Sequence, residues 1–276
     1  MQPITVMVNG IPGKVACTVA RHVLGDPRFS LIPCSFTGPE IQQHEHSVTG
    51  RAIRLIRPEA REAALEELQQ AHGSFLSVDY THPGAVNANA EFYCRHRLPF
   101  VMGTTGGNRQ QLENTIRSSD IAAVVAPNMA KQIVGFQAMM EYAAQTFPDL
   151  FKGYTLHIRE SHQKGKADTS GTARAMVRYF NQLGIPFNED QIAMERNPEI
   201  QKTRWGIPEA HLGGHGWHTY TLVSLDGTVR LEFTHNVNGR EIYAQGTLDA
   251  LRYLHARIVA GERGRMFTMI DVLKGV

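Results

Sequence analysis

Cysteine is scarce in this chain. Only three cysteines occur among 276 residues, at positions 17, 34 and 94. Their odd number and wide spacing argue against a disulfide framework or a paired-cysteine metal knuckle, and a reducing compartment is expected. An excess of charge of one sign is also lacking, because 28 Lys and Arg are balanced by 26 Asp and Glu. The sequence therefore predicts neither nucleic-acid nor membrane binding, and it favours a small molecule as the partner.

Long apolar runs are absent as well. No stretch of about 18 apolar residues, the length that spans a bilayer, occurs. The chain also enters a strand-like run at Ile4 without a signal-peptide pattern. We expect a cytoplasmic protein, with the plastid stroma as the alternative if a transit peptide has been removed. The 42% of hydrophobic residues are sufficient for two modest cores.

The first half of the sequence alternates short β-like runs with longer helical patterns. This alternation is typical of βαβ units, and it predicts an α/β domain with a Rossmann-like, doubly wound parallel sheet. The expected strands cover residues 4–8, 31–36, 75–79, 100–102 and 122–125, and the expected helices cover 15–24, 59–71, 85–96 and 109–118.

The pattern changes after Pro127. Strands now follow one another with few helices between them, which indicates a C-terminal α+β domain with a mostly antiparallel sheet. An amphipathic stretch over 244–259 is then expected to return to the first domain. The predicted domains are 1–130, completed by 240–276, for dinucleotide binding, and 131–239 for substrate binding and oligomerisation. In the second domain the expected helices are 131–147 and 172–183, and the expected strands are 154–160, 191–194, 218–223 and 229–237.

A glycine-containing turn joins the first expected strand to the first expected helix. Glycine at this junction lets a pyrophosphate approach the backbone, and the helix N-terminus offers free N–H groups. On the motif alone, an ordinary βα turn remains the alternative. The residues predicted to bind a dinucleotide here are Gly10, Ile11, Pro12, Gly13, Lys14 and Val15.

No carboxylate stands at the end of the second expected strand, where an NAD-preferring site usually holds the ribose 2′-hydroxyl. Ser35 and Thr37 occupy that end, and Glu40 comes late. Lys14 is near enough to the turn to neutralise a 2′-phosphate. We expect NADPH as the cofactor, with NADH as the alternative, and Ser35 among its contacts. The equally weighted alternative is that these residues are only strand-end and helix-surface positions.

Two further loops follow the expected strands 100–102 and 122–125. Open α/β sheets bind ligands at the carboxyl ends of their strands, so these loops are expected to hold the nicotinamide ring. Ordinary turns have the same composition. We favour nicotinamide binding over an ordinary turn because both loops follow the carboxyl ends of expected strands. The predicted contacts are Gly103, Thr104, Thr105, Ala126, Pro127, Asn128 and Met129.

A polar loop between residues 160 and 173 is predicted to carry the chemistry. Ser170-Gly171-Thr172 opens an expected helix and combines free N–H groups with hydroxyl donors, which suits a carboxylate or a phosphate. Lys166 adds positive charge. His162 can transfer a proton near neutral pH, although a lone histidine is more often a surface or hydrogen-bonded residue.

A second histidine-rich region, which includes His211, His215, His218 and His235, raises the question of zinc. His211 and His215 are four residues apart, but the glycines around them disfavour a helix. No cysteine or carboxylate follows at a usual ligand spacing. The sequence therefore predicts no metal site.

Taken together, these motifs resemble the dihydrodipicolinate reductases, also called 4-hydroxy-tetrahydrodipicolinate reductases, and in particular their plant-type branch. The resemblance extends from about residue 6 to residue 272. Gln163 stands where the bacterial branch has a second histidine. The resemblance rests on the segments 78–81, 99–107, 160–163, 168–173, 235–240 and 269–273.

The resemblance implies reduction of a cyclic imine dicarboxylate by NADPH or NADH in the diaminopimelate route to lysine. It also implies a homo-oligomer, either a dimer or a tetramer. A reductase of a different cyclic imine and a catalytically silent dinucleotide sensor are the alternatives, and the role of Arg240 is left open. The implied catalytic residues are His162 and Lys166, and the implied substrate contacts are Gln163, Lys166, Ser170, Gly171 and Thr172.

Overall fold

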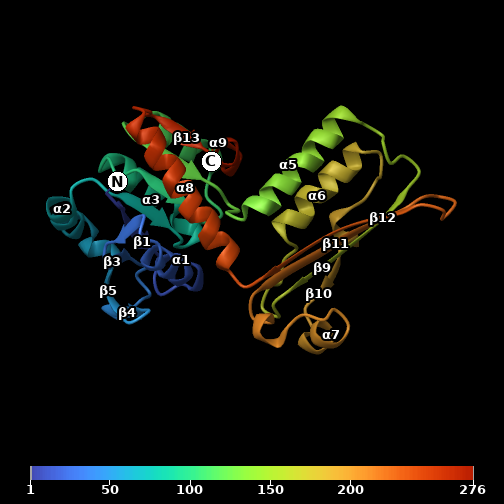
Figure 1. Ribbon diagram of the computed structural model, residues 1–276, viewed down its shortest axis with the longest axis horizontal. Helices are drawn as coiled ribbons and strands as arrows, with labels where there is room; N and C mark the ends of the chain where they lie inside the picture. Colours follow the sequence, from blue (N-terminus) through green and yellow to red (C-terminus); the bar gives the residue numbers. More distant parts are fainter. Residues whose placement is uncertain (1, 276) are drawn as a thin grey trace. The chain divides into compact units, whose positions relative to one another are not determined.

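The computed structural model describes residues 2–275, which form two compact units (Figure 1). One unit combines the residues up to Lys131 with those from Glu241 onward, and the other is the continuous segment Gln132–Arg240. Within the described range, no helix is both long and apolar enough to cross a membrane.

A six-stranded parallel sheet forms the centre of the first unit, in the order β13-β8-β7-β6-β1-β2. From the central β1 the chain runs first to β2 on one side and then to β6, β7 and β8 on the other. This arrangement confirms the predicted doubly wound sheet. Its strands are β1 (Ile4–Asn9), β2 (Phe29–Leu31), β6 (Leu76–Asp79), β7 (Phe100–Met102), β8 (Ala122–Val125) and β13 (Arg265–Phe267).

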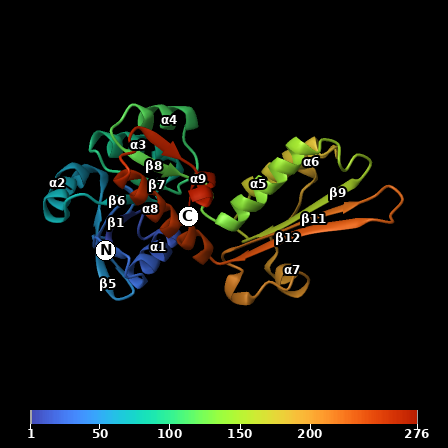
Figure 2. The ribbon, with the colours of Figure 1, turned by 45° about the horizontal axis from the view of Figure 1, so that its top comes forward.

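Helices cover both faces of this sheet (Figure 2). Helices α1 (Lys14–Gly25) and α8 (Glu241–Val259) pack together, and α3 (Val86–Arg95) packs with α4 (Arg109–Arg117). Apolar side chains of α2, α3 and α4 share one core with the strand side chains that point to their face. The other helical elements of the unit are η1 (Pro58–Ala60), α2 (Arg61–His72), η2 (Pro83–Ala85) and α9 (Met269–Gly275).

The expected strand 31–36 is wrong as a single element. β2 ends at Leu31, and β3 (Cys34–Phe36) belongs to a separate sheet with β4 (Glu45–Val48) and β5 (Arg51–Ile56), in the order β3-β5-β4. Pro33 separates the two strands because it lacks the N–H that would continue a ladder. Its carbonyl accepts a hydrogen bond from Arg54 of β5 instead.

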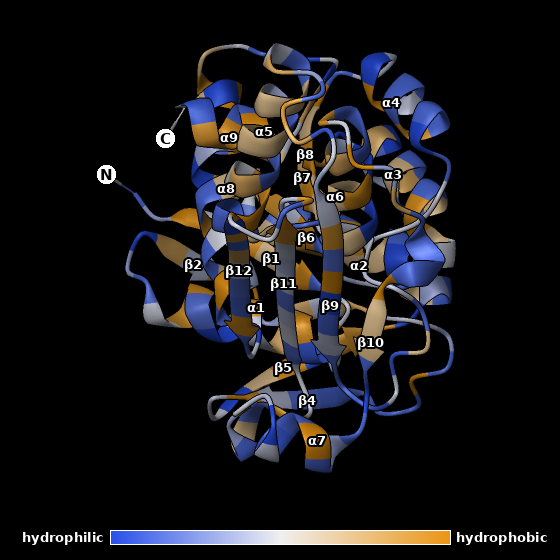
Figure 3. Ribbon diagram, turned by 90° about the vertical axis from the view of Figure 1, so that its right-hand side faces the viewer, coloured by the Kyte–Doolittle hydropathy of each residue, from blue (hydrophilic) through white to orange (hydrophobic). Residues whose placement is uncertain are grey.

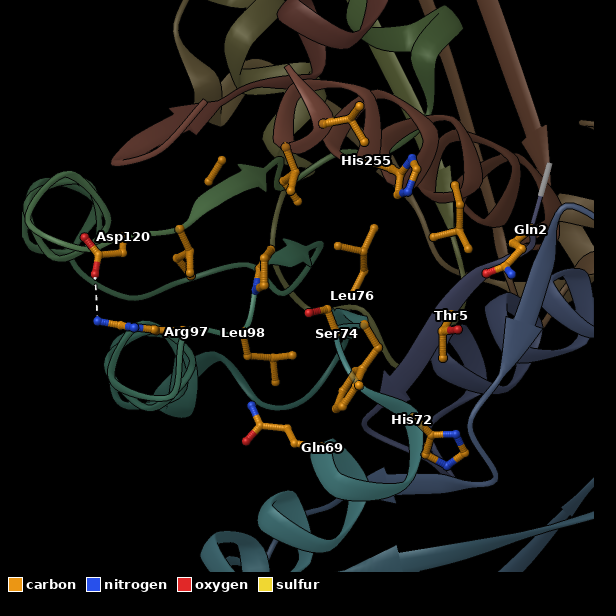
Figure 4. A pocket seen from close by; sticks show the side chains of 18 of the residues that line it. Gln2, Thr5, Gln69, His72, Ser74, Leu76, Arg97, Leu98, Asp120 and His255 are labelled. Carbon is orange, nitrogen blue, oxygen red and sulfur yellow. Dashed lines mark ion pairs between the residues drawn. The ribbon is translucent and has the colours of Figure 1, made fainter. Parts of the chain in front are cut away.

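A cavity of about 900 Å³ lies at the amino ends of the strands of the first unit (Figure 4). Thr5 and Leu76 line it from β1 and β6, and His255 lines it from α8. Open α/β sheets bind their ligands at the opposite, carboxyl ends of the strands. The cavity is therefore separate from the predicted cofactor site.

The second unit contains a four-stranded sheet whose strands lie side by side in the order β10-β9-β11-β12 (Figure 3). Two of its three pairings are antiparallel and the β10–β9 pairing is parallel. Side chains of α5 and α6 form a core with one face of the sheet. The elements are α5 (Lys131–Thr146), β9 (Thr155–His162), α6 (Gly171–Gln182), η3 (Glu189–Gln191), β10 (Ala193–Glu195), α7 (Pro198–Thr203), η4 (Glu209–His211), β11 (His215–Val223) and β12 (Arg230–Asn238).

Gly246 brings α8 into direct contact with the loop that follows β8. A Cβ at this position would overlap the carbonyl oxygen of Met129, and that oxygen belongs to backbone that cannot move aside easily. The predicted nicotinamide loop 126–129 is thereby held against α8 within the first unit.

We expect Gly246→Ala to lower the free energy of unfolding by about 3 kcal/mol, because overpacking against backbone is costly. Chemical denaturation measures the change. Gly25→Ala is the matched control, since a Cβ there meets nothing within 4 Å. The control should leave stability unchanged or raise it by up to about 1 kcal/mol. Equal stability of the two variants would contradict the proposed close contact.

Candidate active site

The glycine turn of the first unit lies at the carboxyl end of β1. Gly10 has a φ of +98°, and a Cβ there would overlap the carbonyl of Tyr80. The turn leads to Gly13 and to the start of α1 at Lys14, where the first N–H groups have no partner within the helix. The structure thus combines a tight backbone turn with a helix N-terminus.

Two hydroxyl groups from the end of β3 hold this turn. Ser35 Oγ accepts a hydrogen bond from the N–H of Ile11 over 3.2 Å, and Thr37 Oγ1 donates to the carbonyl of Ile11 over 2.9 Å. Ser35 is completely buried. It therefore supports the turn, and the cofactor contact that the sequence predicted for Ser35 stays a prediction.

Glu40 folds back toward the end of β3. Its carboxylate lies so close to Gly38 that a Cβ on Gly38 would overlap it. In the sequence, Glu40 comes several residues after the strand end where a ribose contact is expected. In the structure, the turn at 38–40 brings its carboxylate back beside Gly38, near the end of β3. Lys14 and Glu40 are both exposed, so this end of the first unit presents one charge of each sign.

A buried carboxylate, Asp79, ties together the loops at the ends of β6 and β7. It accepts hydrogen bonds from the Tyr93 hydroxyl over 2.8 Å and from Thr104 Oγ1 over 2.5 Å. The N–H of Thr81 also donates to Thr104 Oγ1, over 3.0 Å. Thr104, a predicted cofactor contact, is thereby fixed in position. The sequence signal for Asp79 was an acidic residue that ends an otherwise apolar strand.

The two predicted nicotinamide loops lie next to each other. β7 and β8 pair with Met102 opposite Val125, so the loops 103–105 and 126–129 leave adjacent strands at the same edge. The N–H of Ala126 donates to the carbonyl of Met102, and Asn128 Oδ1 accepts from the N–H of Ala130. The structure therefore brings both loops together at the carboxyl end of the sheet.

In the second unit, strand pairing brings His218 next to the predicted catalytic residue His162. β9 and β11 are antiparallel, with Gly216 opposite His162 and His218 opposite Glu160. The Nδ1 atom of His162 lies 3.0 Å from the carbonyl oxygen of His215. A carbonyl only accepts, so Nδ1 carries the hydrogen and Nε2 has a lone pair, which faces Nε2 of His218 over 3.4 Å.

Glu160 lies beneath this histidine pair and is completely buried. Arg196 Nη2 donates to its Oε1 over 2.5 Å, and the N–H of Ser170 donates to its Oε2 over 3.1 Å. Burial alone would raise the pKa of Glu160, but His218 and Arg196, which face the carboxylate, outweigh burial and lower the pKa to about 2. Glu160 is therefore an anion at neutral pH.

His162 has the opposite preference. Burial is the main cause that lowers its pKa, and the neighbouring His218 adds to the effect, so that the pKa is about 4 even though Glu160 favours the charged ring. The imidazole is thus neutral in the free protein at neutral pH. His162 is positioned to accept a proton at Nε2.

Arg196, which sequence reasoning missed, orders the loop that carries Lys166. Its Nε donates to the carbonyl of Lys166 over 2.8 Å, and its Nη2 donates to the carbonyl of Asp168 over 3.3 Å. No motif distinguishes this arginine in the sequence. Only the parallel pairing of β10 with β9 places it beside Glu160.

The predicted anion loop opens α6 as expected. Ser170 Oγ caps the helix by accepting from the N–H of Thr172 over 3.2 Å, while its own N–H is used by Glu160. Lys166 Nζ lies 2.7 Å from Oδ1 of Asp168, which is exposed. A ligand carboxylate can therefore compete with Asp168 for this ammonium group.

α7, which sequence reasoning also missed, supports the same site through a buried side chain. Gln201 Nε2 donates to the carbonyl of His162 over 2.7 Å and to that of Glu195 over 3.1 Å. Gln163 is half-buried, and its carbonyl accepts from the N–H of Lys166. The Arg240 side chain packs over Gly214.

Two further histidines of the 211–235 region, His215 and His235, have hydrogen-bond partners of their own. His215 Nε2 lies 2.9 Å from the Ser161 hydroxyl, and His235 Nε2 lies 3.2 Å from the Tyr220 hydroxyl. Burial lowers the pKa of His235 to about 3. These two rings therefore serve the packing of the strands around His162 and His218.

Comparison with known proteins matches this architecture over nearly the whole chain. The family described as "Dihydrodipicolinate reductase, N-terminus" matches residues 4–129, and "Dihydrodipicolinate reductase, C-terminus" matches residues 133–273. A solved structure, dipicolinate-bound dihydrodipicolinate reductase from Paenisporosarcina sp. TG-14, has the same fold with a TM-score of 0.66 at 17% identity. The match covers 98% of each chain.

Curated plant proteins are much more similar in sequence. A probable 4-hydroxy-tetrahydrodipicolinate reductase 1, chloroplastic, from Oryza sativa subsp. japonica is 45% identical over 98% of this chain and 78% of its own length. The 4-hydroxy-tetrahydrodipicolinate reductase 1, chloroplastic, from Arabidopsis thaliana is 43% identical over the same shares. On this evidence the chain belongs to the dihydrodipicolinate reductase family.

Proposed function

We propose that this protein reduces 4-hydroxy-tetrahydrodipicolinate to tetrahydrodipicolinate in the diaminopimelate route to lysine. The observation that carries the proposal is the arrangement of His162, Lys166 and the 170–172 loop at the start of α6, in a chain that matches both halves of the reductase family. The site offers a base, an ammonium group and helix N–H groups, which suit a dicarboxylate substrate.

A nicotinamide dinucleotide fits the first unit. The Gly10–Gly13 turn and the α1 N-terminus suit its pyrophosphate, and the loops 103–105 and 126–129 suit its nicotinamide end. The reduced cofactor supplies the hydride. The protein supplies binding and orientation through these backbone groups.

His162 is proposed to manage the proton of the reaction. Its Nε2 lone pair accepts a proton, and the two carboxylates of a bound substrate favour the resulting imidazolium ion. That ion can then donate the proton to the carbon skeleton after the hydride has added. The hydroxyl group leaves as water together with a hydrogen from a neighbouring ring carbon, and one hydride and one proton are added to the resulting double-bond system.

Lys166 is proposed to bind a substrate carboxylate together with the N–H of Gly171 and the hydroxyls of Ser170 and Thr172, because the N–H groups of Ser170 and Thr172 bond to Glu160 and to Ser170 Oγ. The Arg196 hydrogen bonds to the carbonyls of residues 166 and 168 hold the loop in shape for this task. Gln163, adjacent to His162, is proposed to border the same substrate site.

Self-association and compartment stay predictions for this chain. The exposed stripe of large apolar side chains along α5 and the turn after it supports self-association, because monomers rarely expose such clusters. The curated plant relatives are chloroplastic by name, which favours the plastid stroma over the cytoplasm. The stripe consists of Met139, Tyr142, Phe147 and Leu150.

A coupled assay tests the proposed activity. The unstable substrate is generated in situ from pyruvate and aspartate semialdehyde by its synthase, and oxidation of NADPH or NADH is followed by absorbance. We expect oxidation that depends on the synthase. Cofactor binding without oxidation would refute the proposed substrate and favour a different cyclic imine or a silent sensor.

His162→Gln should lower kcat by about 10²- to 10⁴-fold, the usual contribution of a general acid or base, while cofactor affinity stays unchanged. Lys166→Ala should lower kcat/KM by about 10- to 100-fold through loss of a charge-assisted hydrogen bond. His157→Gln and Lys164→Ala are matched controls, since both side chains are exposed. Unchanged turnover in His162→Gln would remove this residue from the mechanism.

Cofactor choice depends on the charges at the end of β3. We propose NADPH as the preferred cofactor, with Lys14 binding the 2′-phosphate and Glu40 opposing it. Lys14→Ala should lower kcat/KM for NADPH by about tenfold with little effect on NADH. Glu40→Gln should raise the ratio of NADPH to NADH efficiency severalfold. If neither substitution changes the ratio of NADPH to NADH efficiency, the contact that distinguishes the two cofactors lies elsewhere in the protein.

A further inference from the structure

Three metal-binding atoms converge on one point in the second unit. Nε2 of His162 lies 3.4 Å from Nε2 of His218 and 3.9 Å from Oε2 of Glu160. Nε2 of His218 lies 3.6 Å from Oε2 of Glu160, so the three atoms form a nearly equilateral triangle. The point equidistant from these atoms lies about 2.1 Å from each, which is the length of Zn–N and Zn–O bonds. The triangle therefore has the size of a metal coordination triangle.

The three separations are long for hydrogen bonds. An N–H donor and its acceptor normally lie 2.7–3.2 Å apart. All three contacts exceed that range, although each group is nearly or completely buried and the strands hold them together. The spacing thus fits three ligands that share a cation better than three groups that bond to one another.

The hydrogen bonds around the three groups also orient them toward a shared cation. The hydrogen bond from Nδ1 of His162 to the His215 carbonyl leaves the Nε2 lone pair free, as in metal sites where a backbone carbonyl orients the histidine ligand. Arg196 donates to Oε1 of Glu160, and the N–H of Ser170 donates to Oε2, so that Oε2 is held facing the two histidines. Nδ1 of His218 has no hydrogen-bond partner among the described residues, whereas its Nε2 faces Nε2 of His162 and Oε2 of Glu160, so a cation takes the place of any proton held between these atoms.

Two imidazoles and one carboxylate select the class of metal. Imidazole favours Zn²⁺ and its late transition-metal neighbours, whereas Mg²⁺ requires six oxygen ligands. The positive charges of Arg196 and Lys166 oppose a cation, so the affinity should be lower than that of a structural zinc site. With three protein ligands, a fourth position remains for water, and His162, at the partly exposed edge of the cluster, provides the path of entry.

We propose that Glu160, His162 and His218 form a zinc-type cation site that inhibits the enzyme. A bound cation occupies the Nε2 lone pair of His162, so this ring can no longer accept or donate a proton there. The inhibition rests on the role given to His162 under the proposed function, whereas metal binding itself does not depend on that role.

Cobalt(II) is the probe for binding, because its visible absorption reports coordination by nitrogen and oxygen in a four-coordinate site. We expect one Co²⁺ per chain, displaced by Zn²⁺ and unaffected by Mg²⁺. His218→Gln and, separately, His162→Gln should each weaken binding by more than about tenfold, since even an outer-sphere partner contributes that much. His157→Gln, on the opposite face of β9, is the matched control and should bind like the wild type.

Thermal unfolding of each variant without metal shows whether it is folded. His162 is more exposed than His218, so His162→Gln is expected to fold and to test the site even if His218→Gln does not fold. A spectrum that survives in both folded histidine variants would place the metal elsewhere, for example at the thiols, and would overturn the assignment. Absence of any Co²⁺ spectrum in the wild type would overturn it as well.

The inhibitory effect is tested separately with Zn²⁺ in the coupled assay, with a chelator added to reverse it. We expect reversible loss of activity in the wild type and in His157→Gln, at the concentrations that displace Co²⁺. The synthase alone is assayed with Zn²⁺ to show that it is not the target. Binding without inhibition would overturn the inhibitory claim and would count against the role of His162, while the metal site itself would stand.

Discussion

The ion pair between Glu160 and Arg196 is the interaction on which the second unit's site depends. A carboxylate without exposure to water is tolerated only when it is paired and hydrogen-bonded, and removing one partner of such a pair typically costs about 3–5 kcal/mol. Here the pair also has a geometric role. The same arginine orders the carbonyls of the 166–168 loop, and the same glutamate takes the N–H of Ser170. One buried charge thus connects the base, the ammonium group and the helix N-terminus.

The first unit uses the same physical device without an arginine. Asp79 ends a central strand, is completely buried, and is surrounded by hydroxyl and amide donors from α3 and from the loops after β6 and β7. A buried carboxylate that accepts several hydrogen bonds holds its donors in fixed positions, because moving any one donor away leaves the buried charge with too few hydrogen bonds. In both units, a buried carboxylate therefore holds loops that carry predicted ligand-binding residues.

Much of this arrangement was predictable from local sequence. The parallel sheet follows from the alternation of apolar runs and helices, and the positions of Gly10, His162 and Ser170 follow from their places at element ends. Residues whose role depends on long-range pairing were not predictable. Arg196, Gln201 and His218 reach His162 only through the register of β9 with β10 and β11, which no spacing within the sequence encodes. The prediction of no metal site considered only histidines close together in the sequence, whereas the ligand set proposed above spans β9 and β11. Pro33 ended β2 early because a missing N–H outweighed the apolar pattern around it.

The first unit is interrupted by the whole of the second, and this has a consequence for folding during synthesis. Residues 132–240 leave the ribosome as one continuous segment and can fold as soon as they emerge. The nucleotide-binding sheet must wait, because the β8 edge is covered only when β13, at residues 265–267, is made. Until then β8 presents an open row of backbone groups, the kind of edge that invites pairing with another chain. Residues 241–275 therefore determine when this edge of β8 is covered, although they contribute none of the predicted ligand-binding residues.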